Sequence, residues 1–139
     1  LPFRAYAQLV IGFLIFGVAL QHTGGGRFFI NLAFATFGHV RGGSAKVAIV
    51  SSGLMGSMSG SVITNVLTTG QMTIPAMKKN GMEKEYAAGV EACASTGGVL
   101  LPPIMGSTAF VIATFLNVAY TTVAVAAAIP ASWYFFGFF

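Results

Sequence analysis

The sequence predicts an all-α membrane protein in which transmembrane helices are combined with a re-entrant helical hairpin and a broken (discontinuous) helix. Of the 139 residues, 55% are hydrophobic and 7% are charged, whereas soluble domains carry about 25% charged residues. The chain has 18 glycines, which in membrane helices indicate close backbone contacts or interrupted helices. Two of its apolar segments contain stretches of Ser, Gly or Pro, and these interruptions predict the hairpin and the broken helix.

The first predicted element is a transmembrane helix over residues 5–23. This segment has 19 residues without a charge, and about 20 apolar residues are needed to cross the hydrocarbon layer. Three consecutive glycines end it. Residues 27–41 place phenylalanines among polar residues between Arg27 and Arg41, so they predict an amphipathic helix that lies along the membrane interface.

Residues 44–79 form the predicted re-entrant hairpin. About 12 residues of helical character run from Lys46 to Ser57, and at about 1.5 Å per residue they reach only ~18 Å, too little to cross the membrane. The polar stretch SMSGS, residues 57–61, follows, and the chain then leads back to two lysines. Since basic flanks favour the cytoplasmic side, both outer ends are expected there, with residues 57–61 as the tip.

Residues 84–119 are predicted to cross the membrane as two half-helices with an unwound middle. Two adjacent prolines preclude a regular helix, and five interrupting residues fall close together here: Gly97, Gly98, Pro102, Pro103 and Gly106. A last transmembrane helix is predicted over residues 121–139, with Trp133 and Tyr134 as interface anchors.

The two interruptions are expected to face each other and to bind something small and polar. In hydrocarbon, exposed backbone persists only where protein or a water-filled cavity covers it. Hard cations prefer oxygen ligands, and the absence of Asp from the chain suits a weakly held monovalent ion such as sodium. The candidate neutral oxygens belong to Ser57, Ser59, Ser61, Thr64, Asn65, Ser95 and Thr96.

Two stretches carry a resemblance to a known family. Residues 41–82 read RGGSAKVAIVSSGLMGSMSGSVITNVLTTGQMTIPAMKKNGM, and residues 87–106 read AAGVEACASTGGVLLPPIMG. Together they resemble the large membrane subunit of tripartite ATP-independent periplasmic (TRAP) transporters, in particular the fused permease that works with TAXI-type binding proteins. The resemblance is clearest over residues 24–115, and it implies that the chain is a fragment covering about the first half of the transport domain.

The resemblance also implies a function. A chain of this kind is expected to be an elevator-type transporter half-domain in the bacterial inner membrane, within a multi-pass protein. The expected activity is sodium-coupled secondary active uptake of a small organic acid delivered by a periplasmic substrate-binding protein. The expected partners are that binding protein, a small membrane subunit or its fused equivalent, the second half of the permease and membrane lipid. No nucleic acid is expected, and no cofactor beyond sodium as the coupling ion.

The same resemblance implies which residues bind ion and substrate. They are Ser57, Gly60, Ser61 and Asn65 at the hairpin tip, and Ser95, Thr96, Gly97, Gly98 and Pro102 in the loop of the broken helix. Sodium is expected at Ser57, Ser61, Asn65, Thr96 and Gly97.

Other interpretations stay open at the level of the sequence. A passive ion channel, or another membrane transporter with a re-entrant hairpin, would share the polar tip. An enzyme is not expected, because the chain has neither a Gly-x-Ser-x-Gly elbow nor an Asp to orient a histidine. Hydroxyls in membrane helices often bond back to a carbonyl or join two helices. Glu91 has either a coupling or a structural role, and Cys93 is expected to be a small buried residue.

Overall fold

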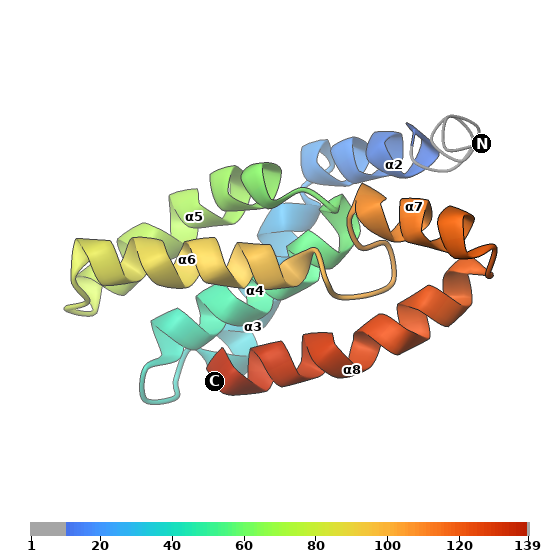
Figure 1. The fold of residues 1–139 in the computed structure, drawn as a ribbon. Helices are drawn as coiled ribbons and strands as arrows, with labels where there is room; N and C mark the ends of the chain where they lie inside the picture. Colours follow the sequence, from blue (N-terminus) through green and yellow to red (C-terminus); the bar gives the residue numbers. More distant parts are fainter. Residues whose placement is uncertain (1–10, 139) are drawn as a thin grey trace.

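The computed structural model describes residues 11–138, and within that range every regular element is a helix (Figure 1). The all-α class predicted from the sequence is therefore confirmed for this part of the chain. The helices are α2 (Ile11–His22), α3 (Gly25–Phe37), α4 (Gly43–Ser59), α5 (Val62–Lys79), α6 (Lys84–Gly98), α7 (Ser107–Leu116) and α8 (Tyr120–Phe138).

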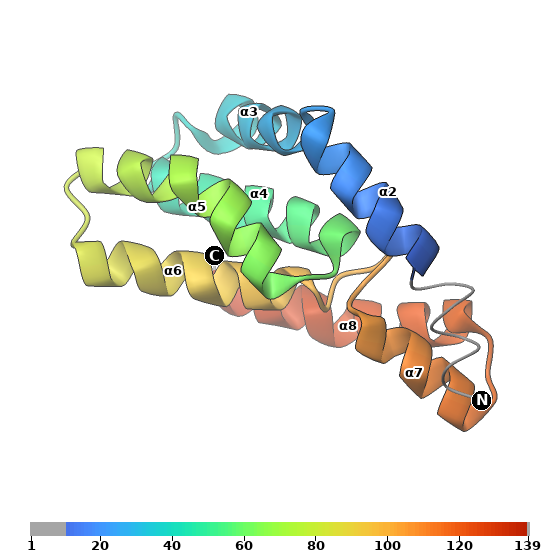
Figure 2. The ribbon, with the colours of Figure 1, turned by 90° about the horizontal axis from the view of Figure 1, so that it is seen from above.

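Helices α4, α5 and α6 contact one another and form the centre of the molecule, and α2 and α3 both contact α4. Helices α4 and α5 run antiparallel, and their turn lies part way along the long axis of the molecule, near the end of α6 (Figures 1 and 2). Helix α7 continues beyond α6, and α8 runs back beside both of them. The turn between α7 and α8 therefore lies at one end of the molecule, beyond the α4–α5 turn.

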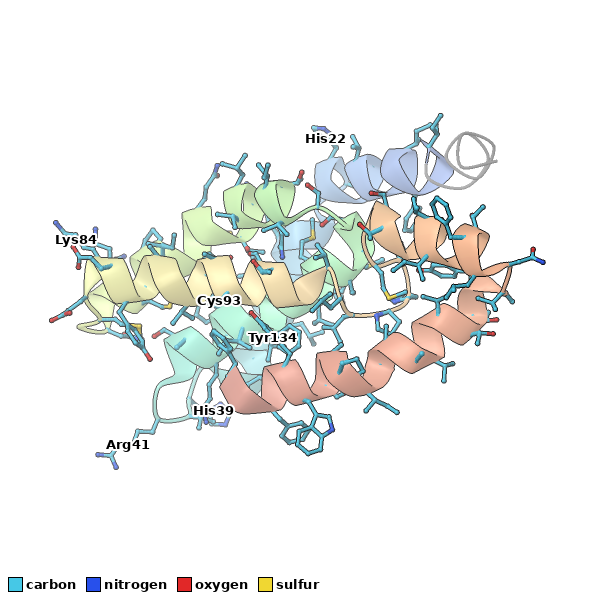
Figure 3. All side chains as sticks on the ribbon, viewed as in Figure 1. His22, His39, Arg41, Lys84, Cys93 and Tyr134 are labelled. Atoms are coloured by element: carbon cyan, nitrogen blue, oxygen red, sulfur yellow. The ribbon has the colours of Figure 1, made fainter. Side chains whose placement is uncertain are left out.

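Basic side chains gather at the opposite end. Arg41 and Lys84 both lie at the end away from the α7–α8 turn (Figure 3). Lys78 and Lys79 occupy the last turn of α5, directly before the connection to α6. Both outer ends of the α4–α5 pair are thus flanked by positive charge.

The interior combines small apolar residues with many buried polar ones. A cluster of Ala48, Ile49, Met77, Ala87, Val90 and Ala94 joins the three central helices. The outer surface is apolar instead: Trp133 is 75% exposed and Phe136 is 85% exposed. Among the described residues α8 is the one helix long and apolar enough to cross a membrane. Large exposed apolar side chains around a partly polar interior are the arrangement expected when lipid or further protein surrounds the molecule.

The segment predicted as a re-entrant hairpin, residues 44–79, contains two helices, but one of them is longer than expected. Helix α4 has 17 residues, about 26 Å of helix, so the expectation of about 12 residues was wrong. The hydroxyls of Ser51 and Ser57 bond back to their own helix, at Val47 O and Leu54 O, so these polar groups are satisfied while the Ser- and Gly-rich sequence stays helical. The turn therefore comes at Gly60, toward the end of the SMSGS stretch.

The remaining predicted segments can be compared with the observed helices. Residues 27–41 overlap α3, which begins at Gly25, and residues 84–119 contain α6 and α7 with a non-helical segment between them. Residues 121–139 overlap α8. The predicted helix over residues 5–23 includes α2, and its first residues, 5–10, lie outside the described part of the chain.

Candidate functional site

The turn between α4 and α5 is built from a glycine and a serine. Gly60 has a left-handed backbone, with φ at 62°, and its N–H bonds Gly56 O, the usual way to end a helix. Ser61 then caps α5, accepting hydrogen bonds from Thr64 N at 3.4 Å and from Thr64 Oγ1 at 3.0 Å. Glycine followed by serine thus reverses the chain with the C-terminal end of α4 and the N-terminal end of α5 side by side.

Residues 99–106 form the non-helical segment between α6 and α7. Gly106 N closes this loop by bonding to Val99 O at 3.0 Å. Met105 has a positive φ of 56°, an uncommon conformation for a side chain of its size. The hydroxyl of Tyr120, on α8, lies 2.8 Å from Pro103 O and 2.5 Å from Ile104 O, so α8 holds the loop in place.

The α4–α5 turn and the 99–106 loop are in direct contact. Ile104 N donates to Ser57 O at 3.2 Å, and Gly60 lies so close to the carbonyl of Met105 that a Cβ would collide with it. The C-terminal ends of α4 and α6 therefore meet the N-terminal ends of α5 and α7 at one place. Because helix C-termini favour cations and N-termini favour anions, this meeting place suits both kinds of charge.

Asn65 lies at the crossing of α4 and α6 beside this contact. Its side chain is fully buried, and Nδ2 donates to Ser52 O at 2.7 Å. A Cβ on Gly56 would lie 2.9 Å from Nδ2, and one on Gly98 would lie 3.3 Å from it. Two glycines thus give the amide its space, and they let the backbones of α4 and α6 touch.

Two buried oxygen atoms near the turn have no hydrogen-bond partner among the described residues. They are Asn65 Oδ1 and Ser59 Oγ. A buried polar atom without a partner costs about 1–3 kcal/mol, so such atoms are uncommon unless a ligand or water satisfies them. Both atoms are acceptors, which is the chemistry that a cation requires.

The structure brings some of the predicted site residues together and not others. Ser57, Gly60, Ser61 and Pro102 belong to the turn, the loop or their contact, and Asn65 and Gly98 lie beside it at the crossing of α4 and α6. The prediction that residues 95–98 lie in the loop was wrong, because α6 stays helical through Gly98. Ser95 is instead buried beside Glu91. Thr96 is exposed, and its hydroxyl donates to Ala92 O on its own helix. Gly97 lies against the rings of Tyr134 and Phe135 on α8.

A second polar group lies in the interior. Of its members only Ser95 was among the predicted site residues, and the role of Glu91 was left open between coupling and structure. The Glu91 carboxyl is fully buried and accepts hydrogen bonds from four hydroxyls, those of Ser52, Thr69, Thr73 and Ser95. We call this group the Glu91 hydroxyl cluster. A sequence signal did exist: Thr69 and Thr73, like Glu91 and Ser95, are four residues apart and share one helix face.

The orientation of α6 also shows that the expectation of a buried Cys93 was wrong. Cys93 is exposed, not buried, because two residues along a helix turn through about 200°, which places Cys93 opposite Glu91. Figure 3 labels Cys93 on α6 and Tyr134 on α8, and Tyr134 OH donates to Cys93 O at 2.9 Å.

A large open cavity lies on the α2–α3 side of α5. It has a volume of about 1020 Å³ and lies between the α2–α3 junction and α5, with polar lining side chains that include His22, Arg27 and Gln71. Of the candidate oxygens named from the sequence, Thr64 lines this cavity, where its hydroxyl donates to Ser61 Oγ. The turn–loop contact and the Glu91 hydroxyl cluster are the sites that we consider further.

Known proteins resemble this chain over most of its length. Residues 2–139 match the family described as "Tripartite ATP-independent periplasmic transporter, DctM component". The C4-dicarboxylate TRAP transporter large permease protein DctM of Vibrio cholerae is 37% identical over 114 residues, which are 81% of this chain and 25% of that protein. The sialic acid TRAP transporter permease protein SiaT of Haemophilus influenzae is 35% identical over 101 residues, 71% of this chain and 16% of that protein.

A third relative belongs to the same kind of transporter. The isethionate TRAP transporter permease protein DctMQ of Oleidesulfovibrio alaskensis is 35% identical over 91 residues, 66% of this chain and 14% of that protein. The chain therefore spans about a quarter of the length of the DctM proteins that it matches, or less of the longer permeases. The matched family is one of transporter permeases and not of enzymes. On these matches, the chain belongs to the DctM family, the large permease component of tripartite ATP-independent periplasmic transporters.

Proposed function

We propose that this chain is part of the transport domain of a TRAP permease that imports a small organic acid by secondary active transport. Family membership supports the transport class. The three relatives are named for C4-dicarboxylates, sialic acid and isethionate, and all three are organic anions. The expected setting is the bacterial inner membrane, with a periplasmic substrate-binding protein, a small membrane subunit and the second half of the permease as partners.

In this proposal helices α4 and α5 are a re-entrant hairpin, and α6 and α7 are the two halves of one broken crossing. Two observations support it. The α4–α5 turn lies part way along the molecule, whereas the α7–α8 turn lies at its end (Figures 1 and 2). The non-helical loop 99–106 lies against the hairpin turn through Ile104 and Ser57, as backbone at membrane depth must be covered by protein or must line a cavity. We further propose that the unit formed by these helices, once it has bound ion and substrate, moves across the bilayer against a fixed scaffold, as in an elevator-type transporter.

The coupling ion is proposed to be sodium, bound beside Asn65. The observation that carries this step is the buried, unpaired Asn65 Oδ1 at the meeting place of four helix ends. Ser59 Oγ adds a second buried acceptor, and the C-terminal ends of α4 and α6 add partial negative charge. Ser95 is not part of this proposed ion site, because its hydroxyl contacts Glu91.

The acidic group of the substrate, a carboxylate or a sulfonate, is proposed to bind at the N-terminal ends of α5 and α7. Gly60 contacts Met105 directly before α7 begins, so the two positive helix ends lie near each other. No side chain caps α7, whose N-cap is Gly106, and the positive end of this helix favours an anion. The second half of the permease would supply the opposite wall of the substrate site.

The test uses the full-length permease with its small subunit in proteoliposomes and its binding protein outside. A C4-dicarboxylate, sialic acid and isethionate are offered in turn, under an inward gradient of sodium chloride or of choline chloride. We expect saturable uptake of one organic acid that requires both the binding protein and sodium. Sodium chloride should also raise the thermal stability of the permease more than choline chloride does, a readout that needs no substrate.

The passive-channel interpretation gives the opposite result. Ohmic current that needs neither the binding protein nor a sodium gradient would exclude secondary transport. Saturable uptake driven equally well in choline chloride would keep the transport class and remove sodium as the coupling ion. The fused, TAXI-type arrangement makes a further prediction: the coding sequence next to that of the permease should encode a TAXI-type binding protein.

A further inference from the structure

Glu91 occupies the middle of α6, where both carboxyl oxygens are surrounded by hydroxyls from three helices. Oε1 lies 2.7 Å from Ser52 Oγ on α4, 2.5 Å from Thr69 Oγ1 on α5 and 3.2 Å from Ser95 Oγ on α6. Oε2 lies 2.5 Å from Thr73 Oγ1 on α5. Gly70 gives the side chain its space, since a Cβ there would lie 3.3 Å from Glu91 Cγ. The site is therefore built around this carboxyl.

The charge of the carboxyl is not balanced by a basic side chain. Glu91 has zero exposure, and its hydrogen bonds within residues 11–138 all come from hydroxyls. The other charged or titratable side chains on α4, α5 and α6 are Lys46, Lys78, Lys79, Lys84, Glu85, Tyr86 and Cys93, and the facing helix α8 adds Tyr120 and Tyr134. None of them donates to Glu91. An ionised carboxylate buried without a cation is costly, and a neutral carboxylic acid is much less so.

The surrounding hydroxyls can satisfy the carboxyl in both of its protonation states. Each hydroxyl has one hydrogen to donate. Thr73 Oγ1 lies within reach of Glu91 Oε2 and also of Thr69 O, at 3.0 Å, and Thr69 Oγ1 likewise reaches Asn65 O, at 2.8 Å. When Glu91 is ionised, both threonines donate to it. When Oε2 carries a proton, that proton is donated to Thr73 Oγ1, and Thr73 turns its own hydrogen to Thr69 O.

The change of state therefore needs only hydroxyl rotations, with no movement of a heavier atom. The carbonyl oxygens of Asn65 and Thr69 provide a second acceptor for the hydrogen of each threonine, so the same side chains fit both protonation states. We propose that the Glu91 hydroxyl cluster is a proton-binding site, in which the carboxylate takes up one proton at Oε2 to become the neutral acid.

The cluster is connected to the turn–loop contact through a single residue. Ser52 donates to Glu91 through Oγ, and its carbonyl oxygen accepts from Asn65 Nδ2. Ser52 Oγ also lies 3.0 Å from Thr69 Oγ1, and the hydrogen of Thr69 Oγ1 can turn from Glu91 to Asn65 O. Protonation is thereby linked to the place where α4, α5 and α6 meet. That link to transport rests on the proposed function, whereas proton binding itself does not.

The direct test is an infrared difference spectrum of the full-length permease in lipid, recorded between acidic and alkaline pH at constant sodium. We expect the C=O band of a protonated carboxyl to appear at the acidic end. Glu91→Gln should lose this band, and the amide can still accept from Ser52 and donate to Thr73. Glu85→Gln, which changes an exposed glutamate on the same helix, should keep it.

Threonine variants test the cluster while leaving Glu91 in place. Thr73→Val removes the hydroxyl that changes direction, so it should shift the pH midpoint of the band. Thr73→Ser keeps the hydroxyl and should show the wild-type midpoint. The proposal is overturned if the wild-type protein lacks the band, or if the band survives in a folded Glu91→Gln protein. It is also overturned if sodium at constant pH removes the band, because the cluster would then be a sodium site. If the band behaves as expected and uptake does not depend on sodium, only the proposed function fails.

Discussion

The side-chain amide of Asn65 on α5 donates a hydrogen bond of 2.7 Å to the carbonyl oxygen of Ser52 on α4. This bond fixes which way the amide points, because only Nδ2 can donate to a carbonyl. Oδ1 is consequently left buried and unpaired. One hydrogen bond between α4 and α5 thus leaves a buried acceptor where α4 and α6 cross, at the proposed sodium site.

Replacement of Asn65 by alanine tests this acceptor. Asn65→Ala should raise the sodium concentration for half-maximal uptake roughly 10-fold, the equivalent of losing about 1.4 kcal/mol of binding free energy. The measurement is uptake by the full-length permease over a sodium titration. The control is Asn80→Ala, which changes an exposed asparagine at the far end of the same helix and should leave the titration unchanged. Equal sodium dependence in both variants would remove Asn65 from the ion site.

Most of the helix order could be predicted from glycine, proline and charge. Gly60 and the Pro102–Pro103 pair mark the two breaks in the central helices, and the lysines mark the outer ends of the hairpin. The length of α4 could not be predicted in this way. Serine and glycine are poor helix formers on average, but in α4 they are buried against α6, where glycine lets the backbones touch and serine bonds back to its own helix.

Replacement of Gly98 tests that close backbone contact. A methyl group at Gly98 would lie 2.6 Å from Ser52 O and 3.0 Å from Gly56 Cα, so Gly98→Ala should force α4 and α6 apart and cost about 1–3 kcal/mol of stability. Thermal unfolding of the full-length permease in detergent measures the loss. The matched control is Gly89→Ala on the same helix, where a Cβ would meet nothing within 4 Å. Gly89→Ala should be neutral or stabilising, and equal unfolding temperatures would show that the contact is absent.

Replacement of Gly60 separates backbone strain from the contact with the loop. Gly60 and Gly81 both have positive φ, at 62° and 85°, but only Gly60 lies against Met105. An alanine at either position costs about 1–2 kcal/mol for the left-handed backbone. Gly60→Ala should therefore destabilise the permease more than Gly81→Ala does, because of the added collision. Similar unfolding temperatures for the two variants would contradict the contact between turn and loop.

The site was less predictable than the fold, since residue type does not tell which face of a helix points inward. Ser95, Thr96 and Gly97 are adjacent in the sequence, but their surroundings differ. Ser95 contacts Glu91, Thr96 is exposed and Gly97 contacts α8. Once Glu91 is known to point inward, the helical period places Ser95 beside it and Cys93 opposite. The orientation of α6 comes from packing against α4 and α5, which composition alone does not encode.

The membrane arrangement of the hairpin can be tested by labelling single cysteines in a Cys93→Ser background. Arg41→Cys and Asn80→Cys change exposed residues at the two outer ends of the hairpin, and Asn117→Cys changes an exposed residue at the α7–α8 turn. In oriented membrane vesicles, a membrane-impermeant maleimide should label the first two from the cytoplasmic side and the third from the opposite side. Labelling of Arg41→Cys and Asn80→Cys from different sides would contradict a hairpin.

Proximity of the hairpin turn to the 99–106 loop can be measured most directly by chemical cross-linking in native membranes. In the Cys93→Ser background, full-length permease carrying Ser57→Cys and Ile104→Cys is treated with a short bis-maleimide, because the backbones of these residues share a hydrogen bond of 3.2 Å. The account predicts an internal cross-link in this pair and none between Ser57→Cys and Asn117→Cys. Failure of the first pair to cross-link, while both cysteines react with a monofunctional maleimide, would contradict it.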